Sequence, residues 1–147
     1  SQRNQCLYRL WISPYAGGDD QGVIGLGEKP WVMWGLDEAR DVVAAVDYVT
    51  NHPDYRDASI GLLSICMGQG AATNAFGLEN GLRGYENIKC MISIQPLDYP
   101  TFIGAMGMPG FMSRSAGRVI RKRTDIDFDK NTFMPHVKDI NVPTLVI

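Results

Sequence analysis

The sequence has few cysteines, no long apolar run and no excess of charge of one sign. Three cysteines in 147 residues are too few for a disulfide scaffold, and an odd number leaves at least one thiol unpaired. No apolar run approaches the roughly 18–20 residues that cross a bilayer, and the polar start of the chain lacks a signal-peptide core. We therefore expect reduced thiols, a cytoplasmic location and no membrane partner.

The charge balance argues against nucleic acid as a partner. Lys and Arg number 14 and Asp and Glu number 16, so the formal net charge is 14 − 16 = −2, whereas nucleic-acid-binding domains usually carry a clear basic excess. With 45% hydrophobic and 20% charged residues, the chain has the composition of a protein that buries a core. The length predicts a single domain over residues 1–147. Because residues 142–147 read as a buried strand, we expect this domain to be partial.

Helices and strands are predicted in alternation. Apolar residues at helical spacing between Ala39 and Val49 predict a helix that ends before Pro53. The full set of expected helices covers residues 37–51, 68–79 and 113–123, and the expected strands cover residues 59–64, 88–94 and 142–147. Near-continuous apolar strands separated by helices indicate an α/β fold, a parallel sheet with helices on both faces. Three strands make a thin sheet, so this core is apparently incomplete.

Residues 62–72, with the sequence LLSICMGQGAA, lie where an expected strand is followed at once by an expected helix. A sharp strand-to-helix turn lifts its central side chain above the sheet and calls for small residues two positions before and after it. Ser64 and Gly68 stand in those two positions, and Cys66 is central. The backbone N–H of Met67 then faces the same space as the Cys66 thiol. The positive end of the helix there stabilises a thiolate, which is the nucleophilic form of cysteine.

This turn resembles the nucleophile elbow, normally G-x-S-x-G, of the α/β-hydrolase superfamily. Its cysteine-centred form is similar to that of the dienelactone hydrolase group. Other segments resemble the superfamily in the same order: residues 2–5 look like the end of the turn after the fourth strand, residues 38–49 like the helix before the elbow, and residues 141–147 like the strand before the catalytic acid. The resemblance implies an α/β-hydrolase-like core. The sequence departs from the motif at Ser64, which stands where the motif has its first glycine.

The resemblance also implies a reaction. It is the hydrolysis of a carboxylic ester, lactone or thioester through a covalent acyl-enzyme, with a small-molecule acyl substrate and no cofactor or metal. Cys66 takes the role of the nucleophile, the backbone N–H of Met67 that of an oxyanion donor, and Asp98, which follows the second strand, that of a candidate acid. In the superfamily the oxyanion loop precedes the segment that matches residue 1, and the histidine follows the segment that matches residue 147. A non-catalytic α/β-hydrolase-like binding or assembly protein is the alternative, and a homo-oligomer stays open.

Other residues admit more than one interpretation. Ser64 is a rival nucleophile, Cys90 is expected to pack in the core, and His136 precedes the last strand whereas the superfamily's histidine follows it. The basic run in residues 114–123 fits a solvated helix end or a site for an anionic substrate. Residues 99–124 are rich in Met and Phe and stand where the superfamily inserts a cap or lid, although packing of a short helix explains them equally well.

Overall fold

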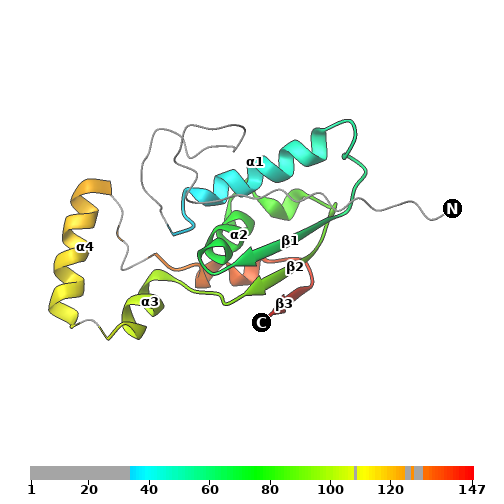
Figure 1. The fold of residues 1–147 in the computed structure, drawn as a ribbon. Coiled ribbons are helices and arrows are strands. Elements are labelled where there is room, and N and C mark those ends of the chain that lie inside the picture. Colours follow the sequence, from blue (N-terminus) through cyan, green and yellow to red (C-terminus); the bar gives the residue numbers. More distant parts are fainter. Residues whose placement is uncertain (1–33, 108, 125–126, 128–130) are drawn as a thin grey trace.

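The structure is a computed structural model that describes residues 34–107, 109–124, 127 and 131–147. Helices and strands alternate along most of this part of the chain (Figure 1). The elements are α1 (Glu38–Asn51), β1 (Ile60–Ile65), α2 (Met67–Gly77), η1 (Leu82–Gly84), β2 (Ile88–Ile94), α3 (Tyr99–Ala105), α4 (Gly110–Thr124), η3 (Met134–Asp139) and β3 (Thr144–Val146).

The three strands form one parallel sheet in the order β1-β2-β3. The register pairs Leu62 with Met91 and Ser64 with Ser93 between β1 and β2, and it pairs Ser93 with Val146 between β2 and β3. Since parallel strands end at the same edge, the residues that follow them are brought together there. The predicted α/β class and the parallel pairing are confirmed.

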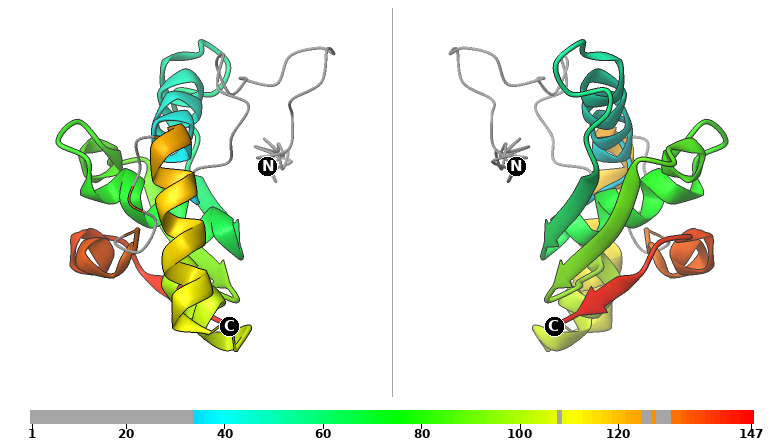
Figure 2. Two further views of the ribbon diagram at one scale, coloured as in Figure 1. Left: turned by 90° about the vertical axis from the view of Figure 1, so that its left-hand side faces the viewer. Right: turned by 90° about the vertical axis from the view of Figure 1, so that its right-hand side faces the viewer.

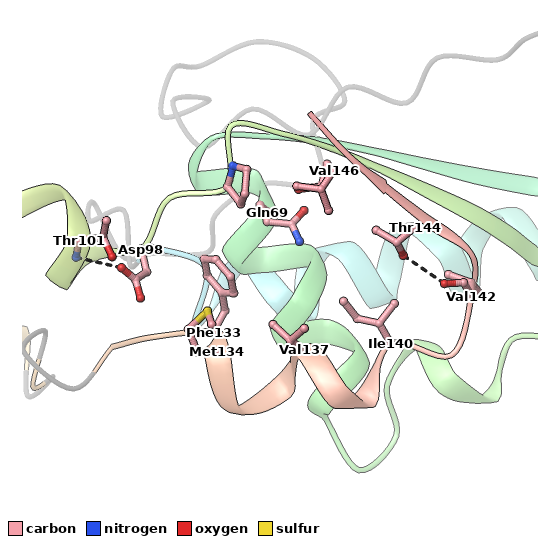
Figure 3. Close-up of a pocket in the computed structure, with 12 residues that line it drawn as sticks. Gln69, Asp98, Thr101, Phe133, Met134, Val137, Ile140, Val142, Thr144 and Val146 are labelled. Atoms are coloured by element: carbon pink, nitrogen blue, oxygen red, sulfur yellow. Dashed lines mark hydrogen bonds between the residues drawn. The ribbon is translucent and has the colours of Figure 1, made fainter.

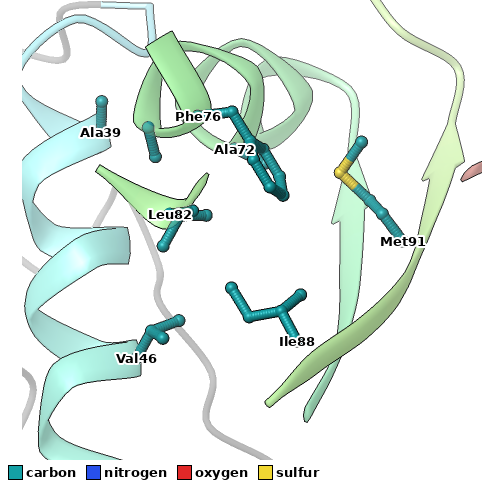
Figure 4. Packing of buried hydrophobic residues seen from close by; sticks show 8 residues of the cluster. Ala39, Val46, Ala72, Phe76, Leu82, Ile88 and Met91 are labelled. Carbon is teal, nitrogen blue, oxygen red and sulfur yellow. The ribbon is translucent and has the colours of Figure 1, made fainter. Parts of the chain in front are cut away.

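Helices α1 and α2 pack on one face of the sheet and bury the core there (Figure 4). Phe76 of α2 and Met91 of β2 are almost completely buried, together with Leu82 of η1. Leu78, Ile140 and other half-buried side chains pack against the edge of this cluster. Burial of each large apolar side chain stabilises the fold by about 1.5–3 kcal/mol, so this cluster is what fixes α2 above β1.

The opposite face of the sheet carries exposed apolar side chains. Successive strand residues point to opposite faces, and Leu63, Ile65 and Ile92 are 64%, 46% and 37% exposed. No helix covers this face within the part of the chain that the structure describes, so the prediction of helices on both faces holds for one face only. Cys90 shares the exposed face with Ile92. The prediction that it packs in the core is wrong, because the alternation buries its neighbour Met91 instead.

The segment predicted as a cap, residues 99–124, forms the two helices α3 and α4. They lie beyond the carboxyl ends of the strands (Figure 1 and the left view of Figure 2). Ile120 of helix α4 packs against Tyr99, as do Trp34 and Ile103. A role for this segment as a lid stays a prediction.

Candidate functional site

Cys66 lies alone between the last residue of β1 and the first residue of α2. Its backbone angles are φ 54° and ψ −120°, outside the regions that L-residues ordinarily adopt. The turn is held by hydrogen bonds from Cys66 N to Ile94 O (2.9 Å) and from Gln69 N to Cys66 O (3.0 Å). One residue therefore absorbs the whole reversal, at a cost of about 1–3 kcal/mol. The positive φ predicted for Cys66 is confirmed.

Two glycines follow the turn, Gly68 and Gly70, and the fold requires a small residue at only one of them. Among the described residues a Cβ at Gly68 would meet nothing within 4 Å, so the expectation that close backbones require a glycine there is wrong. A close approach is found two residues later at Gly70, where a Cβ would lie 3.1 Å from Trp34 O. Helix α2 is thus pressed against the residues that precede α1.

Two further non-glycine residues have positive φ: Gln95 at 50° and Trp34 at 53°. Gln95 follows β2 directly, and its N–H donates to Ile147 O (2.9 Å), so two neighbouring strands both end in strained residues. The Trp34 ring packs against Tyr99 and Phe102, with centroids 5.4 and 5.3 Å away. Strained backbone clusters at functional sites. The sequence held no signal for Gln95, because the residue before a proline normally favours extended backbone.

Ser64 does not compete with Cys66 as the nucleophile. It is 5% exposed, and its hydroxyl donates to Oε1 of Gln69. The Nε2 group of Gln69 in turn donates to Thr73 Oγ1 at 2.8 Å. This chain of hydrogen bonds ties β1 to the first turns of α2 and leaves the Ser64 hydroxyl engaged beneath the helix.

Asp98 lies beyond the carboxyl end of β2 and caps the N-terminus of α3. Its carboxylate accepts hydrogen bonds from Thr101 N (2.9 Å) and from Thr132 Oγ1 (2.6 Å). Burial raises the pKa of the Asp98 carboxyl, but the hydrogen bonds from Thr101 and Thr132 together outweigh burial and hold its pKa below the usual value of 3.8. Asp98 is therefore an anion at neutral pH, as a catalytic acid that orients a base requires.

Both histidines of the sequence lie far from Cys66. His136 packs against Gly77, at the other end of an 11-residue helix that is about 16 Å long. His136 pairs instead with Asp139, at 3.1 Å. His52 follows α1 at the amino edge of the sheet, where the neighbouring Thr50 Oγ1 accepts from Asn87, just before β2. Neither histidine is placed to act as a base for the thiol.

A cavity of about 620 Å³ lies beside the candidate turn, on the face of the sheet that carries α2 (Figure 3). Its walls come from η3 and β3, together with Gln69 of α2, Ser93 of β2 and Asp98. Cys66 is half-buried and unpaired, and it is not among the residues that line this cavity. The sequence predicted that the sulfur of Cys66 faces a pocket, and this cavity does not fulfil that prediction.

No protein-family model, curated protein or solved structure matches this chain. The resemblance to the α/β-hydrolase superfamily accordingly stays a prediction from the sequence, and residues 62–72 are the part of it whose turn geometry the structure describes. Within the described residues no helix is both long and apolar enough to cross a membrane, and no three His, Cys, Asp or Glu side chains gather as metal ligands. Residues 2–5, which carry part of the resemblance, lie outside the described residues.

Proposed function

We propose that this chain contains the nucleophile elbow of an α/β-hydrolase that cleaves a carboxylic ester, lactone or thioester. The observation that carries the proposal is the positive φ of Cys66, a single non-glycine residue between a parallel strand and a helix. A strained residue of this kind persists only where the surrounding structure enforces it. Packing alone gives no reason to keep a half-buried cysteine in such a conformation.

The chemistry follows from the position of Cys66 at the start of α2. The thiolate attacks the carbonyl carbon of the substrate, and the electron pair of the C=O bond moves to the oxygen. The N–H of Met67, at the positive end of the helix, donates to this oxyanion. When the C=O bond re-forms, the alkoxide or thiolate leaves, and Cys66 keeps the acyl group until water hydrolyses it.

Two roles complete the reaction. A base must accept the thiol proton and later activate water, and the proposal places it outside residues 34–147 because His52 and His136 lie far from Cys66. Asp98 is anionic and shares the carboxyl end of the sheet with Cys66, which suits it to orient such a base. Since neither histidine lies beside Cys66, we expect a short activated ester to acylate Cys66 without continued turnover.

One observation favours the alternative, a non-catalytic binding protein. The cavity of about 620 Å³ is lined by residues other than Cys66, as expected if ligand binding and the strained turn are unrelated. Binding of a ligand in this cavity without any reaction at Cys66 is what distinguishes the alternative from the hydrolase.

The test compares Cys66 with Cys90 in the same protein. Cys90 is the more exposed of the two thiols, so accessibility alone favours alkylation there. We expect iodoacetamide to label Cys66 faster at neutral pH and p-nitrophenyl acetate to leave an acetyl group on Cys66, because Cys66 stands directly before the N-terminus of α2 and beside the Met67 N–H. Peptide mass spectrometry locates both labels, with Cys66→Ala and Cys90→Ala as matched controls. Labelling of Cys90 at an equal or higher rate contradicts the proposal.

A further inference from the structure

The cavity beside β3 combines an apolar wall with one buried hydroxyl group. Its volume of about 620 Å³ falls in the range of small-molecule sites, about 300–1,000 Å³. Figure 3 shows Val137 of η3 and Ile140, which follows η3, across the cavity from Gln69 of α2 and Val146 of β3. The apolar lining residues are Pro96, Phe133, Met134, Val137, Ile140, Val142 and Val146.

The hydroxyl group belongs to Ser93. This residue lines the cavity and is 0% exposed, and its Oγ has no hydrogen-bond partner among the described residues. A buried polar group without a partner costs about 1–3 kcal/mol, so native proteins seldom leave one unsatisfied. A ligand oxygen that displaces the atoms now covering Ser93 Oγ would satisfy this hydroxyl and recover this energy.

The other polar groups of the lining already have partners. Gln69 accepts from Ser64 and donates to Thr73. The Thr144 hydroxyl donates to Val142 O at 3.1 Å (Figure 3). Gln69 and Thr144 keep part of their hydrogen-bonding capacity, but Ser93 differs from them in being a buried hydroxyl of this wall with no partner among the described residues, and it can both donate and accept.

The charge of the lining restricts which ligands the cavity can bind. Asp98 is the one charged side chain among the described residues of the lining, and its oxygens accept from Thr101 and Thr132. Its negative charge opposes a carboxylate or phosphate, and these described residues include no Lys or Arg to neutralise one. The cavity thus favours an uncharged molecule.

We infer that this cavity binds an uncharged apolar molecule with a single hydroxyl or carbonyl oxygen, which hydrogen-bonds to Ser93 Oγ. The inference does not depend on the chemistry of Cys66, and it goes beyond the proposed hydrolase activity. A linear aliphatic alcohol or ketone is the simplest member of this class. Its chain lies against Val137 and Ile140, and its oxygen reaches Ser93.

The experiment titrates the full chain with 1-octanol and follows the backbone amides of residues 93, 137, 140 and 146 by NMR. We expect shifts confined to the cavity lining, and weaker ones or none with octanoate, which has the same carbon chain and a negative charge. Ser93→Ala should weaken binding about 3- to 10-fold, since this is the loss of affinity expected when one neutral hydrogen bond is removed. Val137→Phe should weaken binding by narrowing the cavity, and it is tolerable because Val137 is half exposed.

Cys66→Ala serves as the matched control and should leave the affinity for 1-octanol unchanged. Failure of the hydrolase proposal would therefore not affect this result. Three outcomes would overturn the inference: no shifts at the lining residues, equal binding of octanoate and 1-octanol, or unchanged affinity in Ser93→Ala. A correctly folded Ser93→Ala protein is recognised by its unchanged amide spectrum away from the cavity.

Discussion

Replacing Cys66 with glycine should make the protein more stable, although it removes a side chain. Cys66 has φ 54° and ψ −120°, a conformation that glycine adopts without steric cost. The sulfur is half-buried and unpaired, so little packing is lost. Stabilisation by Cys66→Gly would show that the native turn holds its central residue under strain.

The magnitude follows from two opposing effects. Relief of the strained backbone contributes about 1–3 kcal/mol. Glycine also gains more freedom than other residues in the unfolded chain, which costs about 0.5–1 kcal/mol. The expected net rise in the free energy of unfolding therefore lies between about zero and about 2.5 kcal/mol. For a chain of this length each kcal/mol raises the melting temperature by roughly 2–4 °C.

Urea unfolding of four variants isolates the strain. Cys66→Ala keeps a Cβ and should change the free energy of unfolding by less than about 0.5 kcal/mol. The same two substitutions at Cys90 lie in the extended strand β2 and serve as the control. There the Cys90→Gly protein should be less stable than the Cys90→Ala protein. If Cys66→Gly is no more stable than Cys66→Ala, the turn is not strained and the elbow assignment loses its main support.

Three further changes have defined outcomes in the same assay. Phe76→Ala should lower the free energy of unfolding by about 3–5 kcal/mol, since the ring is fully buried in the core. Gly35→Ala should destabilise by at least about 2 kcal/mol, because φ is +93° and a Cβ would lie 2.5 Å from Ala71 N. Asp98→Asn should remove an acid-sensitive contribution: the pKa of Asp98 is below 3.8, so this contribution is fully present above pH 3.8 and is lost as pH falls through the folded-state pKa.

Controls for these changes come from the same chain. Gly104→Ala, in α3 and with nothing within 4 Å of the added Cβ, should leave stability unchanged or raise it, in contrast to Gly35→Ala. Thr132→Val removes one donor to Asp98 and should reproduce part of the effect of Asp98→Asn. A stability difference between Asp98→Asn and the wild type that stays constant from pH 7 to pH 2 would contradict the role given to Asp98.

The order of helices and strands was largely determined by the sequence. The period of the apolar residues predicted α1, β1, α2, β2, α4 and β3 to within a few residues. The abrupt change from a strand to a helix also predicted the positive φ of Cys66, because no residues remain there for a relaxed loop. Helix α3 was missed, although Asp98 as a cap and Pro100 in the first turn were the signals that could have found it.

The tertiary structure decided which side of each strand is buried. Alternation places Cys90 and Met91 on opposite faces of β2, but both are apolar, so the sequence could not say which of them α2 covers. The same packing leaves Ser93 buried without a partner, gives Gln95 its positive φ, and keeps His136 at the far end of α2 from Cys66. These features depend on contacts between residues distant in the chain, such as Gly77 with His136 and Gln95 with Ile147. Local periodicity carries no information about such contacts.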